Sequence, residues 1–383
     1  MAVWYKNDKS TSKAIKNYSS ISEIVSAFDL IPDNKYFVFP GFCDVHVHFR
    51  EPGFFYKETI ATGSRAAAHG GYTTVCTMPN LDPVPDSMEN LKKQLDIIEK
   101  DSVIRVLPYG AITVKEQGKL LSDMPAMKDN VCAFSDDGRG VQDEGMMREA
   151  MHMAKGLGKL IVAHCEDNSL LPDRSSEWRQ IERDVKLSYE TGCAYHVCHI
   201  SCRESVNIIR DAKKSGINVS CETAPHYLLL SDKDVLDEGR FKMNPPIRTM
   251  LDREALIEGI CDGTIEIIAT DHAPHSAEEK SRGFEKSASG IVGMESAFQM
   301  LYTELVRTGI ISLDKLVSLI TENPLTRFNI PKNNDFTVWT LDEKETVDPE
   351  SFLSKGKSTP FAGREVYGKC YLTVSGGKVA YKL

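Results

Sequence analysis

Two histidines and an arginine stand at the end of an apolar stretch near the N-terminus. The ten residues from Gly41 read GFCDVHVHFR and place His46, His48 and Arg50 at alternate positions. In an extended strand, alternate side chains point to the same face. Two neutral imidazoles side by side can bind zinc or a similar metal ion, and a guanidinium beside them can hold an anion. The pattern indicates a hydrolase acting on an anionic substrate, although the histidine pair alone is equally consistent with a buried structural strand.

Other potential metal ligands follow further apolar stretches of the chain. They are Asp136, Asp137, His164, His199 and Asp271. Each has a structural explanation when taken alone, because Asp271 could cap the following segment and the two adjacent aspartates could form a turn. Together with the histidine pair, however, metal-ligand types stand at the ends of five separate strands. This recurrence favours a shared metal centre over chance.

The chemistry of such a centre follows from its ligand types. Four histidines and two carboxylates can hold two divalent metal ions, and an aspartate between the ions offsets part of their charge. Water bound there loses a proton near neutral pH. Asp271, next to that water, could take up the proton and pass it to a leaving nitrogen.

The elements that must position these residues alternate along the chain. Apolar stretches rich in Val, Ile, Thr and Cys are separated by amphipathic helical patterns. The expected strands are 37–49, 72–78, 104–112, 131–135, 160–165, 195–200, 217–222 and 265–270. Such strands are typical of a parallel sheet buried on both faces, and eight of them predict an α/β fold of the (β/α)8 TIM-barrel type. In this fold the carboxyl ends of the strands converge. An open doubly wound sheet is the alternative, but no G-x-G-x-x-G follows a strand.

The sequence pattern changes near both ends of the chain. Alternating stretches at 336–341 and 370–374, and a Gly376-Gly377 turn leading to 379–382, predict antiparallel strands and a hairpin. We therefore expect residues 1–36 and 333–383 to form a small, reduced β appendage and residues 37–332 to form the metal-dependent barrel.

Composition excludes several classes of protein. The net charge is −9 and no basic run occurs, so nucleic acid is not expected as a partner. No stretch approaches the roughly 20 apolar residues that span a bilayer, and the N-terminus lacks the apolar centre of a signal peptide. The ten cysteines are spread through a large chain and are expected to be reduced thiols. These features predict a soluble, cytoplasmic protein without a membrane partner.

A second set of polar residues is suited to binding a substrate. It consists of Arg50, Asn80, Asn244 and His275. Arg50 offers a planar fork that matches a carboxylate, and the two asparagines can read the donors and acceptors of a ring amide. Judged from its neighbouring residues alone, each asparagine could equally well serve only to form a turn.

Ten motifs resemble those of the dihydroorotases of the amidohydrolase superfamily, most closely the class I branch. The resemblance spans about residues 39–330, and a weaker match continues through 359–369. The motifs are DVHVHFREPG (44–53), KET (57–59), GGYTTVCTMPN (70–80), FSDDG (134–138), AHCED (163–167), HVCHIS (196–201), CETAPHYLLL (221–230), NPPIR (244–248), ATDHAPH (269–275) and GIVGMES (290–296).

The resemblance implies a TIM barrel with one or two Zn²⁺ ions per chain. In it, His46, His48 and Asp271 hold one ion, and His164 and His199 hold the other. Many relatives bridge the ions with a carboxylated lysine, for which Lys115 lacks the context, so Asp137 is expected to bridge them. The choice of Asp137 over Asp136 rests on the motif alone. The implied substrate contacts are Arg50, Asn80, Asn244 and His275.

The implied reaction is the reversible, zinc-dependent cyclisation of N-carbamoyl-L-aspartate to L-dihydroorotate in pyrimidine synthesis. The resemblance also implies a homodimer and a possible association with aspartate transcarbamoylase. One alternative is a cyclic amidohydrolase of the hydantoinase, dihydropyrimidinase or allantoinase type, against which Arg50 argues because a neutral ring has no carboxylate. Another is an inactive structural partner of aspartate transcarbamoylase, against which the complete ligand set argues.

Three features depart from the expected family pattern. The segment between His164 and His199 is shorter, the N-terminal portion lacks the usual strand run, and the tail lacks a glycine-alanine-aspartate turn. The loops 231–239 and 281–290 follow or flank site motifs and are candidates for mobility over the substrate.

Overall fold

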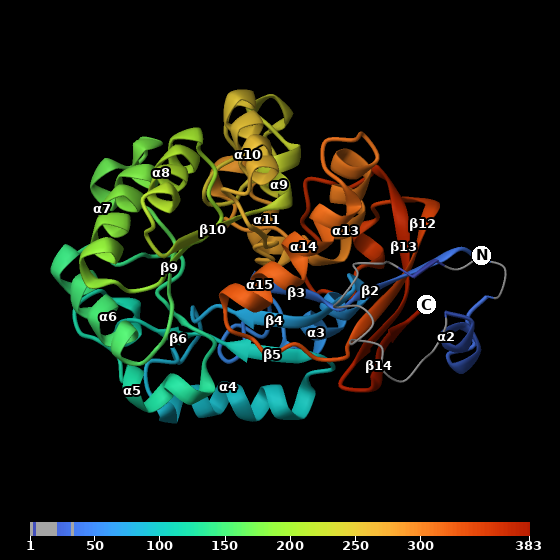
Figure 1. Ribbon diagram of the computed structural model, residues 1–383, viewed down its shortest axis with the longest axis horizontal. Coiled ribbons are helices and arrows are strands. Elements are labelled where there is room, and N and C mark those ends of the chain that lie inside the picture. The colour runs from blue at the N-terminus through green and yellow to red at the C-terminus, as the bar shows by residue number, and fades with distance from the viewer. Residues whose placement is uncertain (1–2, 5–20, 32–33) are drawn as a thin grey trace.

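The structure, a computed structural model, describes residues 3–4, 21–31 and 34–383, and it has an α/β fold (Figure 1). A six-stranded parallel sheet has the order β11-β10-β9-β8-β7-β6, and a three-stranded parallel sheet has the order β3-β4-β5. The strands are β3 (Phe42–Val47), β4 (Tyr72–Thr77), β5 (Arg105–Pro108), β6 (Gly110–Ala111), β7 (Phe134–Ser135), β8 (Ile161–Ala163), β9 (Tyr195–Val197), β10 (Val219–Thr223) and β11 (Ile267–Ile268). The parallel α/β class expected from the sequence is confirmed.

The two parallel sheets adjoin each other at both of their edges. An isolated parallel bridge between Val47 and His272 connects β3 with the segment that follows β11. On the other side, only Tyr109 separates β5 from β6, and its backbone N–H donates to the Thr77 carbonyl at the end of β4, at 3.0 Å. The carboxyl ends of these parallel strands therefore face a common region.

Helices follow the strands, and α6, α7, α8 and α10 lie along the outside of the fold (Figure 1). The first turns are capped: Thr59 accepts a hydrogen bond from the Thr62 N–H, and Asp143 accepts one from the Met146 N–H. The helices are α2 (Ile21–Ala27), α3 (Ile60–His69), α4 (Met88–Asp101), α5 (Met124–Met127), α6 (Glu144–Gly156), α7 (Ser175–Thr191), α8 (Arg203–Lys214), α9 (Pro225–Leu229), α10 (Met250–Asp262), α11 (Ala277–Lys280), α12 (Gly283–Lys286), α13 (Met294–Leu301), α14 (Leu313–Ile320) and α15 (Glu322–Arg327). In the described part of the chain, none of them combines the length and the apolarity needed to cross a bilayer.

A five-stranded sheet joins the two ends of the chain. Its order is β1-β2-β12-β13-β14, and all neighbours except β1 and β2 are antiparallel. The strands are β1 (Val3–Trp4), β2 (Tyr36–Pro40), β12 (Phe336–Thr346), β13 (Glu365–Ser375) and β14 (Lys378–Lys382). The predicted hairpin is confirmed, because Gly376 and Gly377 both have positive φ, at 57° and 76°, between β13 and β14. Residues 1–2, 5–20 and 32–33 of the expected appendage lie outside the described residues.

The expectation of one strand over residues 37–49 is wrong. Gly41 divides the stretch: β2 pairs with β12 in the five-stranded sheet, whereas β3 pairs with β4. The backbone passes so close to β4 at this point that a Cβ on Gly41 would lie 2.0 Å from the Thr73 Oγ1. An unbroken apolar pattern cannot reveal such a change of sheet. The division into two domains stays a prediction, and this pairing favours a boundary near Gly41 rather than at residue 37.

Aromatic side chains pack the five-stranded sheet against the rest of the fold. Phe42 at the start of β3 lies 5.0 Å, between ring centroids, from Phe298 of α13 and 6.0 Å from Trp339 of β12. Phe39 of β2 lies 5.5 Å from the same Phe298. All four side chains are buried. Burial of large aromatic rings is strongly stabilising, so this contact fixes the base of β3, which carries His46 and leads directly to His48.

Candidate metal and substrate site

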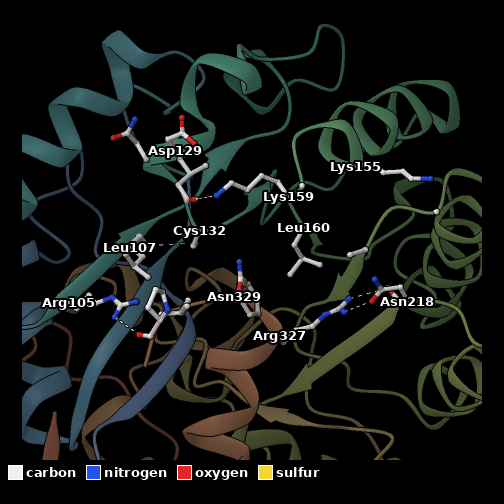
Figure 2. A pocket seen from close by; sticks show the side chains of 18 residues that line it. Arg105, Leu107, Asp129, Cys132, Lys155, Lys159, Leu160, Asn218, Arg327 and Asn329 are labelled. Atoms are coloured by element: carbon white, nitrogen blue, oxygen red, sulfur yellow. Dashed lines mark hydrogen bonds between the residues drawn. The ribbon is translucent and has the colours of Figure 1, made fainter. Parts of the chain in front are cut away.

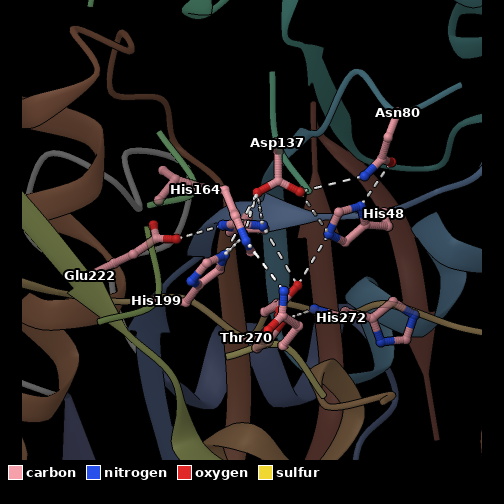
Figure 3. Close-up of polar contacts among 12 residues, drawn as sticks. His48, Asn80, Asp137, His164, His199, Glu222, Thr270 and His272 are labelled. Carbon is pink, nitrogen blue, oxygen red and sulfur yellow. Dashed lines mark hydrogen bonds and ion pairs between the residues drawn. The ribbon is translucent and has the colours of Figure 1, made fainter. Parts of the chain in front are cut away.

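The carboxyl ends of the parallel strands bring the expected metal ligands together. His46 lies in β3 and His48 just beyond it, while Asp137, His164, His199 and Asp271 follow β7, β8, β9 and β11. All six side chains are buried. Figure 3 shows His48, His164 and His199 gathered around Asp137. Two overlapping groups, His46 with Asp137 and His199, and His46 with His48 and Asp271, each have ligand atoms within 4.8 Å of one another.

Asp137 lies between the histidines of this cluster. Its Oδ1 is 3.4 Å from the His46 Nε2, 3.7 Å from the His199 Nε2 and 3.9 Å from the His164 Nδ1. Its Oδ2 is 3.6 Å from the His48 Nε2. Burial alone would raise the pKa of Asp137, but the charges of the surrounding histidines, His46 above all, hold it well below its ordinary value. The carboxylate is therefore ionised and within reach of all four imidazoles.

The neighbouring Asp136 faces the opposite way. Its Oδ1 accepts hydrogen bonds from the backbone N–H groups of Ile112 and Thr113, at 2.8 and 3.0 Å, and its Oδ2 accepts one from the Thr113 hydroxyl. Asp136 thus fixes the backbone that follows β6. Of the two aspartates, only Asp137 has its carboxylate in the histidine cluster.

Asp271 completes the cluster from the end of β11. Its Oδ1 lies 3.1 Å from the His48 Nε2 and 3.6 Å from the His46 Nε2. Burial would raise the pKa of Asp271, but the hydrogen bond to His48 and the charge of His46 keep it below its usual range. An ionised carboxylate at this place can bind a metal ion or accept a proton.

The cluster fits a metal ion on the evidence of its unsatisfied atoms. The Nε2 of His46 and the Oδ1 of Asp137 are fully buried and have no hydrogen-bond partner among the described residues. Buried polar atoms without partners are rare and call for an explanation. Here the two unsatisfied atoms lie 3.4 Å apart, a separation that suits two ligand atoms of one metal ion.

Glu222 is a candidate functional residue that the sequence analysis missed. It lies in β10, and its Oε1 is 2.6 Å from the Nδ1 of His46, which turns the Nε2 of that ring toward the cluster. Its Oε2 is 3.1 Å from the His196 Nε2. Burial raises its pKa, but the charges of His46 and His196 and its hydrogen bonds to both rings together outweigh this and lower the pKa to about 2. In the sequence, Glu222 could have been recognised as a candidate because a charged residue is unusual inside a buried stretch such as 217–222.

Replacing Glu222 by glutamine is expected to weaken metal binding by about 10- to 100-fold, because loss of such an orienting carboxylate has effects of this size. The measurement is a competition titration with a chromophoric chelator. Glu58→Gln is the matched control, since Glu58 is equally buried but contacts His272, which is not among the candidate ligands. Equal weakening in both variants would argue against a specific role of Glu222.

Three residues of the site have a strained backbone. The φ angles are 61° for Arg50, 31° for His199 and 47° for Asp271. Non-glycine residues rarely adopt this left-handed region, and the strained ones gather at functional sites. Neighbouring backbone bonds hold the conformation, such as the one from His48 N to the His272 carbonyl at 2.8 Å. The strain aims these side chains at a common cavity.

That cavity has a volume of about 230 Å³ and is lined by residues of both predicted sets, including every candidate metal ligand except His46. The second set, Arg50, Asn80, Asn244 and His275, contributes four of the lining side chains. Arg50 is 9% exposed, and its guanidinium donates to the Pro274 carbonyl at 3.3 Å and to the Asn80 Oδ1 at 3.4 Å. No carboxylate of the described residues lies within 4.0 Å of it. Burial lowers its pKa, partly offset by Asp271. A buried guanidinium without a counter-ion suits an anionic ligand.

The other three members are held by polar contacts. Asn80 Oδ1 lies 3.0 Å from the His48 Nδ1, and Asn244 Nδ2 lies 3.4 Å from the His164 Nε2. The Nε2 of His275 lies 2.8 Å from the Ser289 carbonyl oxygen. Burial, together with the positive charge of Arg50, lowers the pKa of His275 to about 3. The imidazole is therefore neutral. The exposed Lys115 is not among the residues that line the cavity.

Sequence comparison identifies the family. A family model described as Dihydro-orotase-like matches residues 35–176. A protein named dihydroorotase from Fusobacterium nucleatum subsp. nucleatum is 54% identical, with 94% of this chain and 92% of the relative covered. The chain belongs to the dihydroorotase family. Dihydroorotases from Staphylococcus aureus strain MRSA252 and from Bacillus cytotoxicus are 48% and 45% identical to it. These two matches cover 97% and 98% of this chain and 94% and 93% of the relatives' own lengths.

Solved structures show the same fold in more distant proteins. An L-hydantoinase (dihydropyrimidinase) from Arthrobacter aurescens superposes with a TM-score of 0.83 at 24% identity, covering 91% of this chain and 86% of its own. A D-hydantoinase (dihydropyrimidinase) from a Thermus species gives 0.80 at 24% identity, with 91% and 85% covered. This member of the dihydroorotase family therefore has the fold of cyclic amidohydrolases.

Proposed function

We propose that the protein is a dihydroorotase that interconverts N-carbamoyl-L-aspartate and L-dihydroorotate in pyrimidine synthesis. Family membership at 45–54% identity over nearly the whole chain supports this activity. The observation that carries the substrate assignment is Arg50, a buried guanidinium without a carboxylate partner beside the histidine–aspartate cluster. The free carboxylate of either substrate supplies the missing counter-charge.

The cofactor is proposed to be one or two Zn²⁺ ions. His46, His48 and Asp271 would hold one ion, His164 and His199 the other, and Asp137 would lie between them. Nitrogen and carboxylate ligands in this ratio suit zinc. A divalent ion here supplies Lewis acidity, which polarises the amide carbonyl and acidifies the attacking water.

The protein's own residues then bind the substrate and move protons. Asp271 is the proposed catalytic base: its ionised carboxylate accepts a proton from the attacking water and returns it to the ring nitrogen as the amide bond breaks. Ring closure uses the same groups in the reverse direction. Arg50 holds the substrate carboxylate, and Asn80, Asn244 and the neutral His275 orient the ring amide groups.

The two parallel sheets are proposed to form a single closed (β/α)8 barrel. The bridge from Val47 to His272 and the continuity of β5 with β6 support closure at the two places where the sheets meet. A homodimer, association with aspartate transcarbamoylase and a cytoplasmic location stay predictions. Light scattering of the purified chain, alone and mixed with that enzyme, tests the first two.

The experiment that tests the function combines metal analysis with an absorbance assay. The chain as purified is expected to contain zinc and to hydrolyse L-dihydroorotate, and removal of the metal with a chelator is expected to abolish the activity until zinc is returned. Dihydrouracil and hydantoin, which lack the carboxylate, are the control substrates. Faster turnover of these neutral rings would indicate a hydantoinase-type enzyme, and a chain without metal or activity would indicate a structural partner.

A further inference from the structure

A second, larger cavity lies at the opposite ends of the strands from the proposed active site. Its volume is about 480 Å³ (Figure 2). Arg105 begins β5, Lys159 lies two residues before β8, and Ala194 immediately precedes β9, and all three line it. Because these are the amino ends of parallel strands, the cavity is separate from the site at their carboxyl ends. The proposed reaction assigns it no role.

Positively charged side chains from different elements surround this cavity. Arg105, Lys159 and Arg327 of α15 line it, together with the exposed Lys155 (Figure 2). Each of the four donates a hydrogen bond to a backbone carbonyl. Within the described ranges, none of them has a carboxylate oxygen within 4.0 Å. Asp129 is the one carboxylate-bearing residue of the lining, so the lining carries four cationic side chains and one carboxylate.

A purely structural role explains these cations only in part. Arg105 donates to the Pro331 carbonyl at 2.9 Å and Lys159 to the Val131 carbonyl at 2.8 Å, which stabilises the loops at this end. Each keeps further N–H groups, however. The terminal nitrogens of Arg327 donate to Asn218 and to the Tyr195 carbonyl, but its buried Nε has no partner among the described residues. Burial lowers the pKa of Arg327 to about 10 and also lowers that of Lys159. These shifts reflect burial without a sufficient counter-charge.

The other residues that line the cavity combine polar and apolar groups, as a site for a small polar molecule does. The amides of Asn130 and Asn329 offer donors and acceptors, the Asn218 side chain offers its N–H groups, and Leu107, Leu160 and Phe328 provide apolar surface. We propose that this cavity binds the phosphate group of a small phosphorylated molecule, with Arg105, Lys159 and Arg327 as its ligands. Guanidinium forks and an ammonium group are the side chains that recognise phosphate oxygens, and an anion would supply the missing counter-charge.

Calorimetric titration of the full, metal-loaded chain tests the proposal, with inorganic phosphate and ribose 5-phosphate as probes at constant ionic strength. One molecule of either probe is expected to bind per chain. Tighter binding of ribose 5-phosphate than of inorganic phosphate would show that the cavity also recognises the sugar. Lys159→Gln and Arg105→Gln are each expected to weaken binding by about tenfold or more, as loss of one charge-assisted hydrogen bond implies. Both variants should retain zinc and dihydroorotate hydrolysis.

Two controls make the result specific. Lys214→Gln removes the same charge from an exposed side chain of α8 that does not line the cavity, and it is expected to leave binding unchanged. Asp137→Asn alters the proposed metal centre, where phosphate could also bind. Absence of binding up to about 10 mM, equal affinity in Lys159→Gln and Lys214→Gln, or loss of binding only in Asp137→Asn would overturn the proposal.

Discussion

Replacing Asp137 by asparagine is expected to lower both bound zinc and dihydroorotate hydrolysis by at least about 100-fold, more than the loss of a group that merely orients a ligand. The reason is the position of the carboxylate, which lies within 4 Å of His46, His48, His164 and His199. An amide keeps the shape of the side chain but removes the charge that offsets the metal ions. Elemental analysis and an absorbance assay on the same preparation measure the two effects.

Asp136→Asn is the matched control, because it makes the same change one residue earlier. Asp136 accepts hydrogen bonds from Ile112 and Thr113 and does not face the histidines. We expect this variant to keep its zinc while losing about 1–3 kcal/mol of unfolding free energy, the cost of weakening buried hydrogen bonds to a carboxylate. If Asp136→Asn lost the metal and Asp137→Asn kept it, the assignment of the two aspartates would be reversed.

The convergence of the site was predictable because it follows from strand direction. His164 and His199 each follow an apolar stretch, and in parallel strands the carboxyl ends lie together whatever the intervening helices do. The sequence therefore indicated which residues share a cavity. It did not indicate which way each side chain faces: the motif selected Asp137 over Asp136, and the physical difference between them lies in their partners, His46 and Thr113.

Other features depended on contacts between residues distant in the sequence. Glu222 orients His46 across 176 positions of the chain, and no local pattern links the two. The change of sheet at Gly41 depends likewise on Thr73 and on the pairing of β2 with β12. Periodicity reports which faces are buried but not which neighbour buries them. This limit explains why the expected strand over residues 37–49 was drawn too long.

The second large effect is expected from Arg50→Met, which keeps much of the side-chain length and removes the charge. Among the described residues this guanidinium donates hydrogen bonds to the Pro274 carbonyl and the Asn80 Oδ1 and pairs with no carboxylate, so its charge is available to the substrate. Loss of one partner of a buried charge pair costs about 2–5 kcal/mol, and kcat/KM for dihydroorotate should therefore fall by about 30- to 4,000-fold. Zinc content should not change, because Arg50 is not among the proposed ligands.

A cation at the same side of the cavity provides the comparison for Arg50. Lys57 lies 3.2 Å from the His275 Nδ1, but its ammonium group already pairs with Glu279 at 2.9 Å. Because this charge is already balanced, Lys57→Met should lower kcat/KM far less than Arg50→Met does. The contrast separates a specific carboxylate contact from general attraction of an anion, which would affect both variants alike. Retention of full activity in Arg50→Met would show that another group binds the substrate carboxylate, and it would remove the main argument against a neutral cyclic amide as the substrate.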